Sequence, residues 1–136
     1  MQVTGILETA LHVENLERAI AFYLRLFGFA VMARDQRFCA FNVAGRDVLL
    51  LFKRGESTRP MPVPGGIIPP HDGQGRMHIA FSIPSAELAD WERRLADQQI
   101  PVESTVDWPG GGKSVYFRDP DQHLLELATP GIWPNY

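Results

Sequence analysis

The segment KSVYFRDPDQHLLELA, residues 113–128, gives the strongest indication of the fold. Two runs of strand-forming residues flank the turn-forming group DPDQ at 119–122, which predicts a β-hairpin. Because side chains alternate between the faces of a strand, Leu125 and Leu127 point to one face and Glu126 to the other. A carboxylate on a buried strand is costly unless a hydrogen-bond network, a cation or a metal ion compensates its charge. We therefore expect other parts of the chain to provide partners for Glu126.

Two other predicted strands carry a histidine on the face opposite their more apolar side chains. At residues 6–13 this histidine is His12, and at residues 76–83 it is His78. The side chains that share the face of His12 are Ile6, Glu8 and Ala10. If the apolar faces pack on helices, His12, His78 and Glu126 share the other side of the sheet, where two imidazoles and a carboxylate can bind a divalent metal ion. Both histidine strands lead into a predicted helix, which indicates that His12 and His78 are counterparts in a duplicated sequence.

The composition predicts one globular domain. At 136 residues with 45% hydrophobic side chains, the chain is long enough for one well-buried core and short for two ordinary domains. A net charge of −3, without a stripe of Lys or Arg, gives no indication of a nucleic-acid partner. The single Cys39 excludes an intrachain disulfide and fits a reducing compartment. No signal-peptide pattern and no apolar run of ~20 residues occurs, so we expect a cytoplasmic protein without a membrane segment.

The order of predicted elements repeats along the chain. In the first half a strand is followed by a helix, which Asn15 can cap and Gly28 can end, and then by three strands. These elements are predicted at 6–13, 15–27, 29–34, 38–43 and 47–53. In the second half, where Ser85 can cap the helix, they are predicted at 77–83, 86–99, 102–107, 114–118 and 123–128. The fold class is therefore α+β, with two tandem βαβββ modules at 1–54 and 76–136 in a single domain, 1–136.

The segment 55–75 separates the two modules. It contains five of the eleven prolines and five of the twelve glycines, which predicts a long loop without regular structure. This loop is either a linker or a lid over a ligand, because long loops inside compact domains are often functional. The strand before it contains VLLLF at 48–52, a continuous apolar run that is typical of a strand covered on both faces.

Three stretches resemble the vicinal oxygen chelate superfamily, which groups glyoxalase I, fosfomycin-resistance thiol transferases, extradiol dioxygenases, methylmalonyl-CoA epimerase and bleomycin-resistance proteins. They are LHVENLERAIAFYLRLFGF at 11–29, MHIAFSI at 77–83 and SVYFRDPDQHLLEL at 114–127. The closing motif, aromatic-x-D-P-D-x-H-x-x-E, is the most specific part. The resemblance implies paired βαβββ modules that form a cupped, eight-stranded mixed sheet around a metal ion, with helices on the outer face.

The resemblance also implies a ligand set for one divalent metal ion, which falls on His12, His78 and Glu126. Glyoxalase I and the epimerase use a fourth protein ligand, and the matching position is Leu50 or Leu51, neither of which can ligate a metal. The remaining three-ligand site is nearest to the manganese-dependent fosfomycin thiol transferases and to dioxygenase-like members with ferrous iron. Manganese, iron, nickel and zinc all stay open as the metal. Two other histidines, His71 and His123, are less suited as ligands because one lies in the loop and the other on the face of Leu125.

Several residues are candidates for contact with a substrate. Ser114 and Tyr116 match the Ser and Tyr with which the fosfomycin enzymes contact a phosphonate, but Glu14 replaces a Thr of that site, which argues against a phosphonate substrate. Tyr116 is a candidate hydrogen-bond donor to a substrate oxygen, or it packs as an aromatic ring. Glu14 is a candidate proton acceptor, or it helps to cap the first helix. Trp108 and Trp133 are candidates for the wall of an apolar pocket, or Trp133 packs against a second subunit.

The function predicted on this basis is that of a metal-dependent enzyme, a lyase, transferase or dioxygenase, that chelates a small substrate through two adjacent oxygens at the metal. The alternative is a binding protein of the bleomycin-resistance type that sequesters a small molecule, with the 55–75 segment as its clamp. The resemblance further implies a homodimer with shared sites, in which His12 comes from one subunit and His78 with Glu126 from the other.

Overall fold

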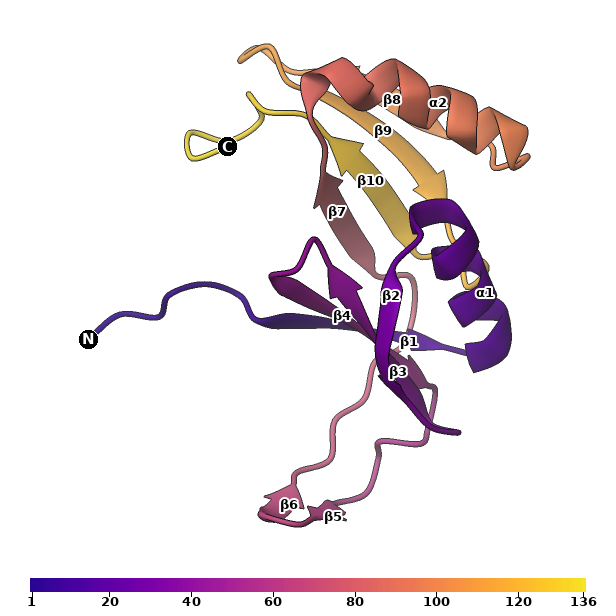
Figure 1. The fold of residues 1–136 in the computed structure, drawn as a ribbon, viewed down its shortest axis with the longest axis vertical. Helices are drawn as coiled ribbons and strands as arrows, with labels where there is room; N and C mark the ends of the chain where they lie inside the picture. Colours follow the sequence, from indigo (N-terminus) through magenta and orange to yellow (C-terminus); the bar gives the residue numbers. More distant parts are fainter. The chain divides into compact units, whose positions relative to one another are not determined.

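The computed structural model describes residues 1–136 and divides the chain into two compact units, Met1–Gly75 (unit 1) and Arg76–Tyr136 (unit 2). Each unit contains a four-stranded mixed sheet and one α-helix, so the α+β class with two βαβββ modules is confirmed (Figure 1). A two-stranded antiparallel sheet is added in unit 1.

The sheet of unit 1 has the strand order β1-β4-β3-β2, with β1 parallel to β4 and the other neighbours antiparallel. Its elements are β1 (Glu8–Val13), α1 (Leu16–Phe27), β2 (Ala30–Arg34), β3 (Phe38–Val43) and β4 (Asp47–Lys53). The predicted ends of the helix are confirmed, because Asn15 Oδ1 accepts a hydrogen bond from Arg18 N (2.9 Å) and Gly28 adopts the left-handed conformation at φ 68°. The apolar side of α1 is buried, with Tyr23 and Leu26 fully inside the core.

The sheet of unit 2 repeats this arrangement with the order β7-β10-β9-β8. Its elements are β7 (His78–Ser82), the 3₁₀-helix η1 (Ser85–Glu87), α2 (Leu88–Asp97), β8 (Ser104–Asp107), β9 (Lys113–Arg118) and β10 (Leu124–Ala128). The prediction that Ser85 caps the helix is wrong. A 3₁₀ turn comes first, closed by Glu87 N donating to Pro84 O (3.0 Å), and neither this turn nor α2 has a side-chain cap.

The two sheets share one hydrogen-bonding register, which identifies corresponding residues in the two units. The carbonyl just before β1 accepts a hydrogen bond from Val48 N (3.0 Å), and the carbonyl just before β7 accepts one from Leu124 N (2.8 Å). Val48 pairs with Glu8, and Leu124 pairs with His78. Glu8 is therefore the counterpart of His78.

The same register extends across the neighbouring strands. The corresponding pairs are Leu50 and Glu126, Ala40 and Tyr116, Phe38 and Ser114, and Phe41 and Phe117. The predicted duplication is confirmed, but the pairing of His12 with His78 is wrong, since the counterpart of His12 is Ser82. Alternation fixes the face of a strand on which a side chain lies, but not its position along the strand.

The segment 55–75 has regular structure, contrary to the prediction. It contains a hairpin of β5 (Met61–Val63) and β6 (Gly66–Ile68), and a hydrogen bond from His71 N to Ser57 O (2.9 Å) closes its base. A proline is tolerated in such a short edge strand because no further strand needs its missing N–H. The expectation for β4 is also wrong, because Leu49 and Leu51 are buried whereas the alternate side chains are only half-buried.

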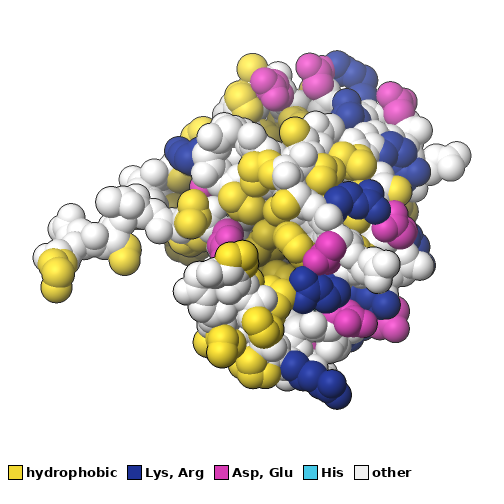
Figure 2. Space-filling model, turned by 60° about the horizontal axis from the view of Figure 1, so that its bottom comes forward, with side chains coloured by type: hydrophobic (Ala, Val, Ile, Leu, Met, Phe, Trp, Pro, Cys, Tyr) yellow, Lys and Arg dark blue, Asp and Glu magenta, His cyan; other side chains and the backbone are white.

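Apolar side chains also reach the surface. On the β5–β6 hairpin, Val63, Ile67 and Ile68 are exposed by 39 to 67%. On the face drawn in Figure 2, apolar side chains gather together, with charged side chains around them, instead of being scattered singly. No helix is long and apolar enough to cross a membrane.

Candidate metal centre

His78 and Glu126 lie side by side on the paired strands β7 and β10. His78 Nε2 is 3.2 Å from Glu126 Oε2, and His78 Nδ1 is 3.1 Å from Leu124 O. Because a carbonyl oxygen only accepts hydrogen bonds, Nδ1 carries the ring hydrogen and is the donor of this hydrogen bond. The other ring nitrogen, Nε2, points toward the carboxylate. A backbone hydrogen bond of this kind fixes the orientation of histidine side chains that bind metals. The pair can therefore supply two ligands to a metal ion.

The second oxygen of the Glu126 carboxylate is held by a buried chain of hydrogen bonds. Ser114 Oγ donates to Glu126 Oε1 (2.5 Å), and Trp108 Nε1 donates to Ser114 Oγ (2.8 Å). Ser114 is 1% exposed and Glu126 6% exposed. The serine hydroxyl thus gives its hydrogen to the carboxylate, so Ser114 and Trp108, both predicted to contact substrate, contact the carboxylate chain here. Such a chain fixes the carboxylate and leaves Oε2 for the metal.

Tyr116 stands beside this pair on β9, where it is the register partner of Glu126. Its ring centroid is 6.3 Å from that of His78. Burial, with a further contribution from the Glu126 carboxylate, raises the pKa of Tyr116, although a hydrogen bond with Ser114 opposes the shift. The phenol therefore keeps its proton at neutral pH and remains a hydrogen-bond donor beside His78 and Glu126.

A cavity of about 400 Å³ lies in front of these residues, entirely within unit 2. Its floor includes His78, Tyr116 and Glu126, and its wall comes from the C-terminal tail. The tail side chains that line it are Ile132, Trp133 and Tyr136. Tyr136 is fixed because its hydroxyl donates to Ala128 O (2.8 Å).

Three glycines press the tail against the turn before β9. A Cβ atom on Gly110 would lie 2.3 Å from Gly131 O, and one on Gly112 would lie 2.8 Å from Gly131 C. Real Cβ atoms essentially never approach so closely, so the backbones can meet only because these residues are glycine. The tail is therefore a fitted wall of the cavity.

His12 lies in unit 1 in a different environment. It is 5% exposed, and its ring is 5.8 Å from the ring of Phe52 and 5.5 Å from that of His71. A Cβ atom on Gly73 would lie 2.4 Å from His12 Nδ1, so the chain after the hairpin packs directly on the imidazole. The contact between His12 and His71 was not predicted, because the two residues are far apart in sequence. Glu8, at the other end of the same strand face, is exposed.

The remaining predicted residues have other partners. Glu14 forms an ion pair with Arg54 (3.0 Å) and does not cap α1, a role taken by Asn15. His123 is fully buried, and its Nδ1 accepts a hydrogen bond from Met77 N (2.9 Å). The imidazole of His123 therefore ties the start of β10 to the residue before β7.

Neither unit by itself gathers three or more His, Cys, Asp or Glu side chains that could hold a metal ion. The donor set of unit 2 fits a divalent metal ion, since one imidazole and one carboxylate with fixed hydrogen bonds converge at its cavity.

Tandem βαβββ units with an imidazole–carboxylate pair at a cavity define the class of glyoxalase-like proteins. The chain belongs to the Glyoxalase/Bleomycin resistance protein/Dioxygenase superfamily, whose family model matches residues 5–127. The predicted resemblance to this superfamily is thereby confirmed.

Individual relatives are named as a metallothiol transferase, a lyase and a fosfomycin resistance protein. Metallothiol transferase FosB from Shouchella clausii is 29% identical over 131 residues, which cover 93% of this chain and 81% of that protein. A crystal structure of lactoylglutathione lyase from Agrobacterium tumefaciens has 34% identity and a TM-score of 0.89, with 98% and 99% of the two chains covered. The fosfomycin resistance protein FosX from Listeria monocytogenes, complexed with Mn(II) and sulfate, has 25% identity and a TM-score of 0.70 over 94% of this chain and 91% of that one.

Proposed function

We propose that this protein is a metal-dependent enzyme that acts on a small molecule with two adjacent oxygens. The observation that carries the proposal is the pair of His78 Nε2 and Glu126 Oε2, 3.2 Å apart, with Nδ1 and Oε1 already hydrogen-bonded elsewhere. Relatives named as a metallothiol transferase, a lactoylglutathione lyase and a Mn(II)-bound resistance protein support metal-dependent chemistry of this kind.

We further propose Glu8, in place of His12, as the third ligand. The common register of the two sheets makes Glu8 the counterpart of His78, and Glu8 is exposed at the start of β1. His12 corresponds to Ser82 and is covered by the 55–75 segment. A set of one imidazole and two carboxylates favours a hard divalent ion such as manganese or ferrous iron over zinc.

The site then requires both units. His78 and Glu126 belong to unit 2 and Glu8 to unit 1, so the two units function together as one domain or pair across a homodimer. We propose the homodimer with shared sites. Mixing Glu8→Gln protein with Glu126→Gln protein tests it, because subunit exchange would restore one intact site per mixed dimer. No recovery of metal binding after exchange would contradict shared sites.

Each side chain of the site has its own role in the proposed reaction. When bound, the divalent metal would supply Lewis acidity toward the two substrate oxygens. Ser114 and Trp108 hold the Glu126 carboxylate, and the Tyr116 phenol donates a hydrogen bond to an oxygen on which negative charge develops. The apolar tail wall with Ile132 and Trp133 contacts the carbon part of the substrate.

We also infer a cytoplasmic location. Cys39 is fully buried, and this burial raises the pKa of its thiol, so it is an unreactive core residue rather than half of a disulfide. A protein without disulfides is typical of a reducing compartment.

The central test measures metal content by mass spectrometry and Mn(II) affinity by EPR. His78→Ala, Glu126→Gln and Glu8→Gln are expected to lower the affinity by about 100-fold or more, because each removes one ligand. His12→Ala is the matched variant for the alternative ligand set, and we expect it to leave the affinity within about threefold. Loss of the metal in His12→Ala with retention in Glu8→Gln would reverse the assignment. A metal-free protein that binds no divalent ion would favour the small-molecule-sequestering alternative.

A further inference from the structure

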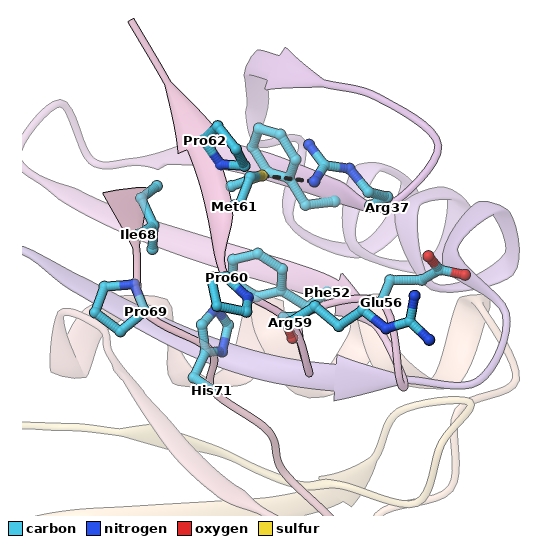
Figure 3. A pocket seen from close by; sticks show the side chains of 12 residues that line it. Arg37, Phe52, Glu56, Arg59, Pro60, Met61, Pro62, Ile68, Pro69 and His71 are labelled. Carbon is cyan, nitrogen blue, oxygen red and sulfur yellow. Dashed lines mark hydrogen bonds between the residues drawn. The ribbon is translucent and has the colours of Figure 1, made fainter. Parts of the chain in front are cut away.

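A second cavity, of about 210 Å³, lies in unit 1 between the β3–β4 pair and the 55–75 segment (Figure 3). None of the proposed metal ligands lines it, since His78 and Glu126 belong to unit 2 and Glu8 lies elsewhere on β1. The family resemblance and the metal centre leave this cavity without a role.

Aromatic rings form one side of the cavity. Phe38 and Phe52 are register partners on β3 and β4, with ring centroids 5.9 Å apart and planes at 27°. The imidazole of His71 meets Phe52 edge-on at 4.6 Å and 75°. Such a corner of two nearly parallel rings and one perpendicular ring offers both face and edge contacts to a flat ring.

The cavity has an apolar end and a charged end. Figure 3 shows Ile68 and Pro69 on one side, and Glu56 and Arg59 on the other. A ligand that fits both ends has an apolar body with a charged group at one position.

The charged end provides one cation without a partner. Arg37 pairs with Asp35 (2.8 Å), and Glu56 pairs with Lys53 (3.7 Å). The guanidinium of Arg59 makes no such contact, and a guanidinium group binds a planar carboxylate through two parallel hydrogen bonds. The positive charge of Arg59 favours a ligand with a negatively charged group at this end of the cavity.

The roof of the cavity is held in place by several contacts. The β5–β6 hairpin pairs Met61 with Ile68, and the Arg37 guanidinium donates to the Met61 sulfur. The chain that follows packs on His12 at Gly73. The cavity is therefore a formed site and not a gap under a free loop.

We propose that this cavity binds a single aromatic ring with one carboxylate group, the ring against Phe52 and His71 and the carboxylate at Arg59. The volume of about 210 Å³ sets the size, because it is below the roughly 300 Å³ at which pockets for drug-sized ligands begin. No proposed metal ligand is among the residues that line this cavity.

The test uses benzoate as the probe and two-dimensional amide NMR of the full chain as the readout. Benzoate is expected to bind with a Kd on the order of 1 mM, as for other ligands of this size, and to shift the amide signals of Phe52, Arg59 and His71. Benzyl alcohol lacks the charge and cyclohexanecarboxylate lacks the flat ring, so each is expected to bind about tenfold more weakly.

Three variants separate this site from other carboxylate sites. Arg59→Gln is expected to weaken benzoate binding about tenfold, whereas Arg46→Gln, which changes an exposed arginine of the same unit outside the cavity, leaves it unchanged. Glu126→Gln also leaves it unchanged, because it removes only the proposed metal centre. Absence of shifts at the cavity, shifts confined to unit 2, or equal weakening in both arginine variants would overturn the proposal.

Discussion

The sheets of unit 1 and unit 2 have the same strand order and register, yet four corresponding positions carry very different side chains. The positions of His78, Glu126, Tyr116 and Ser114 in unit 2 are occupied in unit 1 by Glu8, Leu50, Ala40 and Phe38. One sheet therefore has a linked set of polar groups, and the other has a single carboxylate among apolar side chains. The backbone pairing is the same in both sheets, and a few side chains decide whether a sheet carries the proposed imidazole–carboxylate pair of ligands or the wall of an aromatic cavity.

The cores of the two units should be equivalent, and removing their central rings is expected to give the largest effect. Phe41 and Phe117 are counterparts, and both are 0% exposed. Phe41→Ala and Phe117→Ala should each lower the free energy of unfolding by about 3–5 kcal/mol in urea denaturation, because each leaves a large cavity. Val31→Ala, at a 38% exposed position, should cost less than about 1 kcal/mol. If only one of the phenylalanine variants lost much unfolding free energy, the two cores would not be equivalent in stability despite their common strand register.

The polar chain behind Glu126 distinguishes unit 2 from unit 1. Ser114→Ala is expected to lower Mn(II) affinity about 10- to 100-fold, since it frees Glu126 Oε1 from its hydrogen bond. Trp108→Phe should have a smaller effect in the same direction, because it removes only the donor to the serine. Ser104→Ala changes an exposed serine of the same unit and should leave the EPR titration unchanged. Equal Mn(II) affinities in all three variants would show that Ser114 does not position the Glu126 carboxylate.

Unit 1 alone has a long segment folded onto the end of its first strand. Gly73→Ala is expected to destabilise the protein by about 1–3 kcal/mol, because the new Cβ would lie 2.4 Å from the buried ring of His12. Gly65→Ala is the matched control, with no atom within 4 Å of its Cβ, and should change the unfolding free energy by less than about 0.5 kcal/mol. The double variant His12→Ala/Gly73→Ala should recover part of the loss caused by Gly73→Ala. Equal thermal denaturation of the two glycine variants would contradict the packing of the segment on His12.

The smallest effect is expected at the turn between β2 and β3 of unit 1, which should be sensitive to acid. Burial raises the pKa of Asp35, but hydrogen bonds from the Arg37 side chain and from the Arg37 and Phe38 backbone outweigh it and lower the pKa below 3.8. A lowered folded-state pKa stabilises the protein above pH 3.8, and this contribution is lost as the pH falls through the folded-state value. Asp35→Asn should therefore cost a few tenths of a kcal/mol at pH 7, as expected for an exposed pair, and progressively less as the pH falls below 3.8 and through the folded-state pKa. A series of urea denaturations at decreasing pH checks this, and a pH-independent cost would contradict it.

Much of the fold could be predicted from local patterns. Alternation placed Glu126 opposite Leu125 and Leu127, which are 0 and 1% exposed, and the caps Asn15 and Gly28 fixed both ends of α1. The site was harder to predict because its geometry depends on pairing between distant strands. Alternation could not decide which residue of the first strand corresponds to His78, since Glu8 and His12 lie on the same face, and only the register with β4 separates them.

The direction in which a side chain points could not be predicted from local sequence patterns either. Ser114 was correctly placed on a strand next to Glu126, but the sequence does not indicate that its hydroxyl points at the carboxylate instead of into the cavity. The hairpin in the 55–75 segment was missed because proline and glycine content predicts a loop, whereas its two short strands are stabilised by pairing with each other and by the hydrogen bond between His71 and Ser57 at its base.

The C-terminal tail, pressed against Gly110 and Gly112, shapes the cavity of unit 2 but contributes no charged side chain to it. Mutations between Gly131 and Tyr136 can therefore alter which molecules are admitted while the inner groups that act on them remain as they are. During evolution, a new preference could arise in those few residues before any change in the strands, which makes the tail the natural region to randomise in directed evolution of this protein.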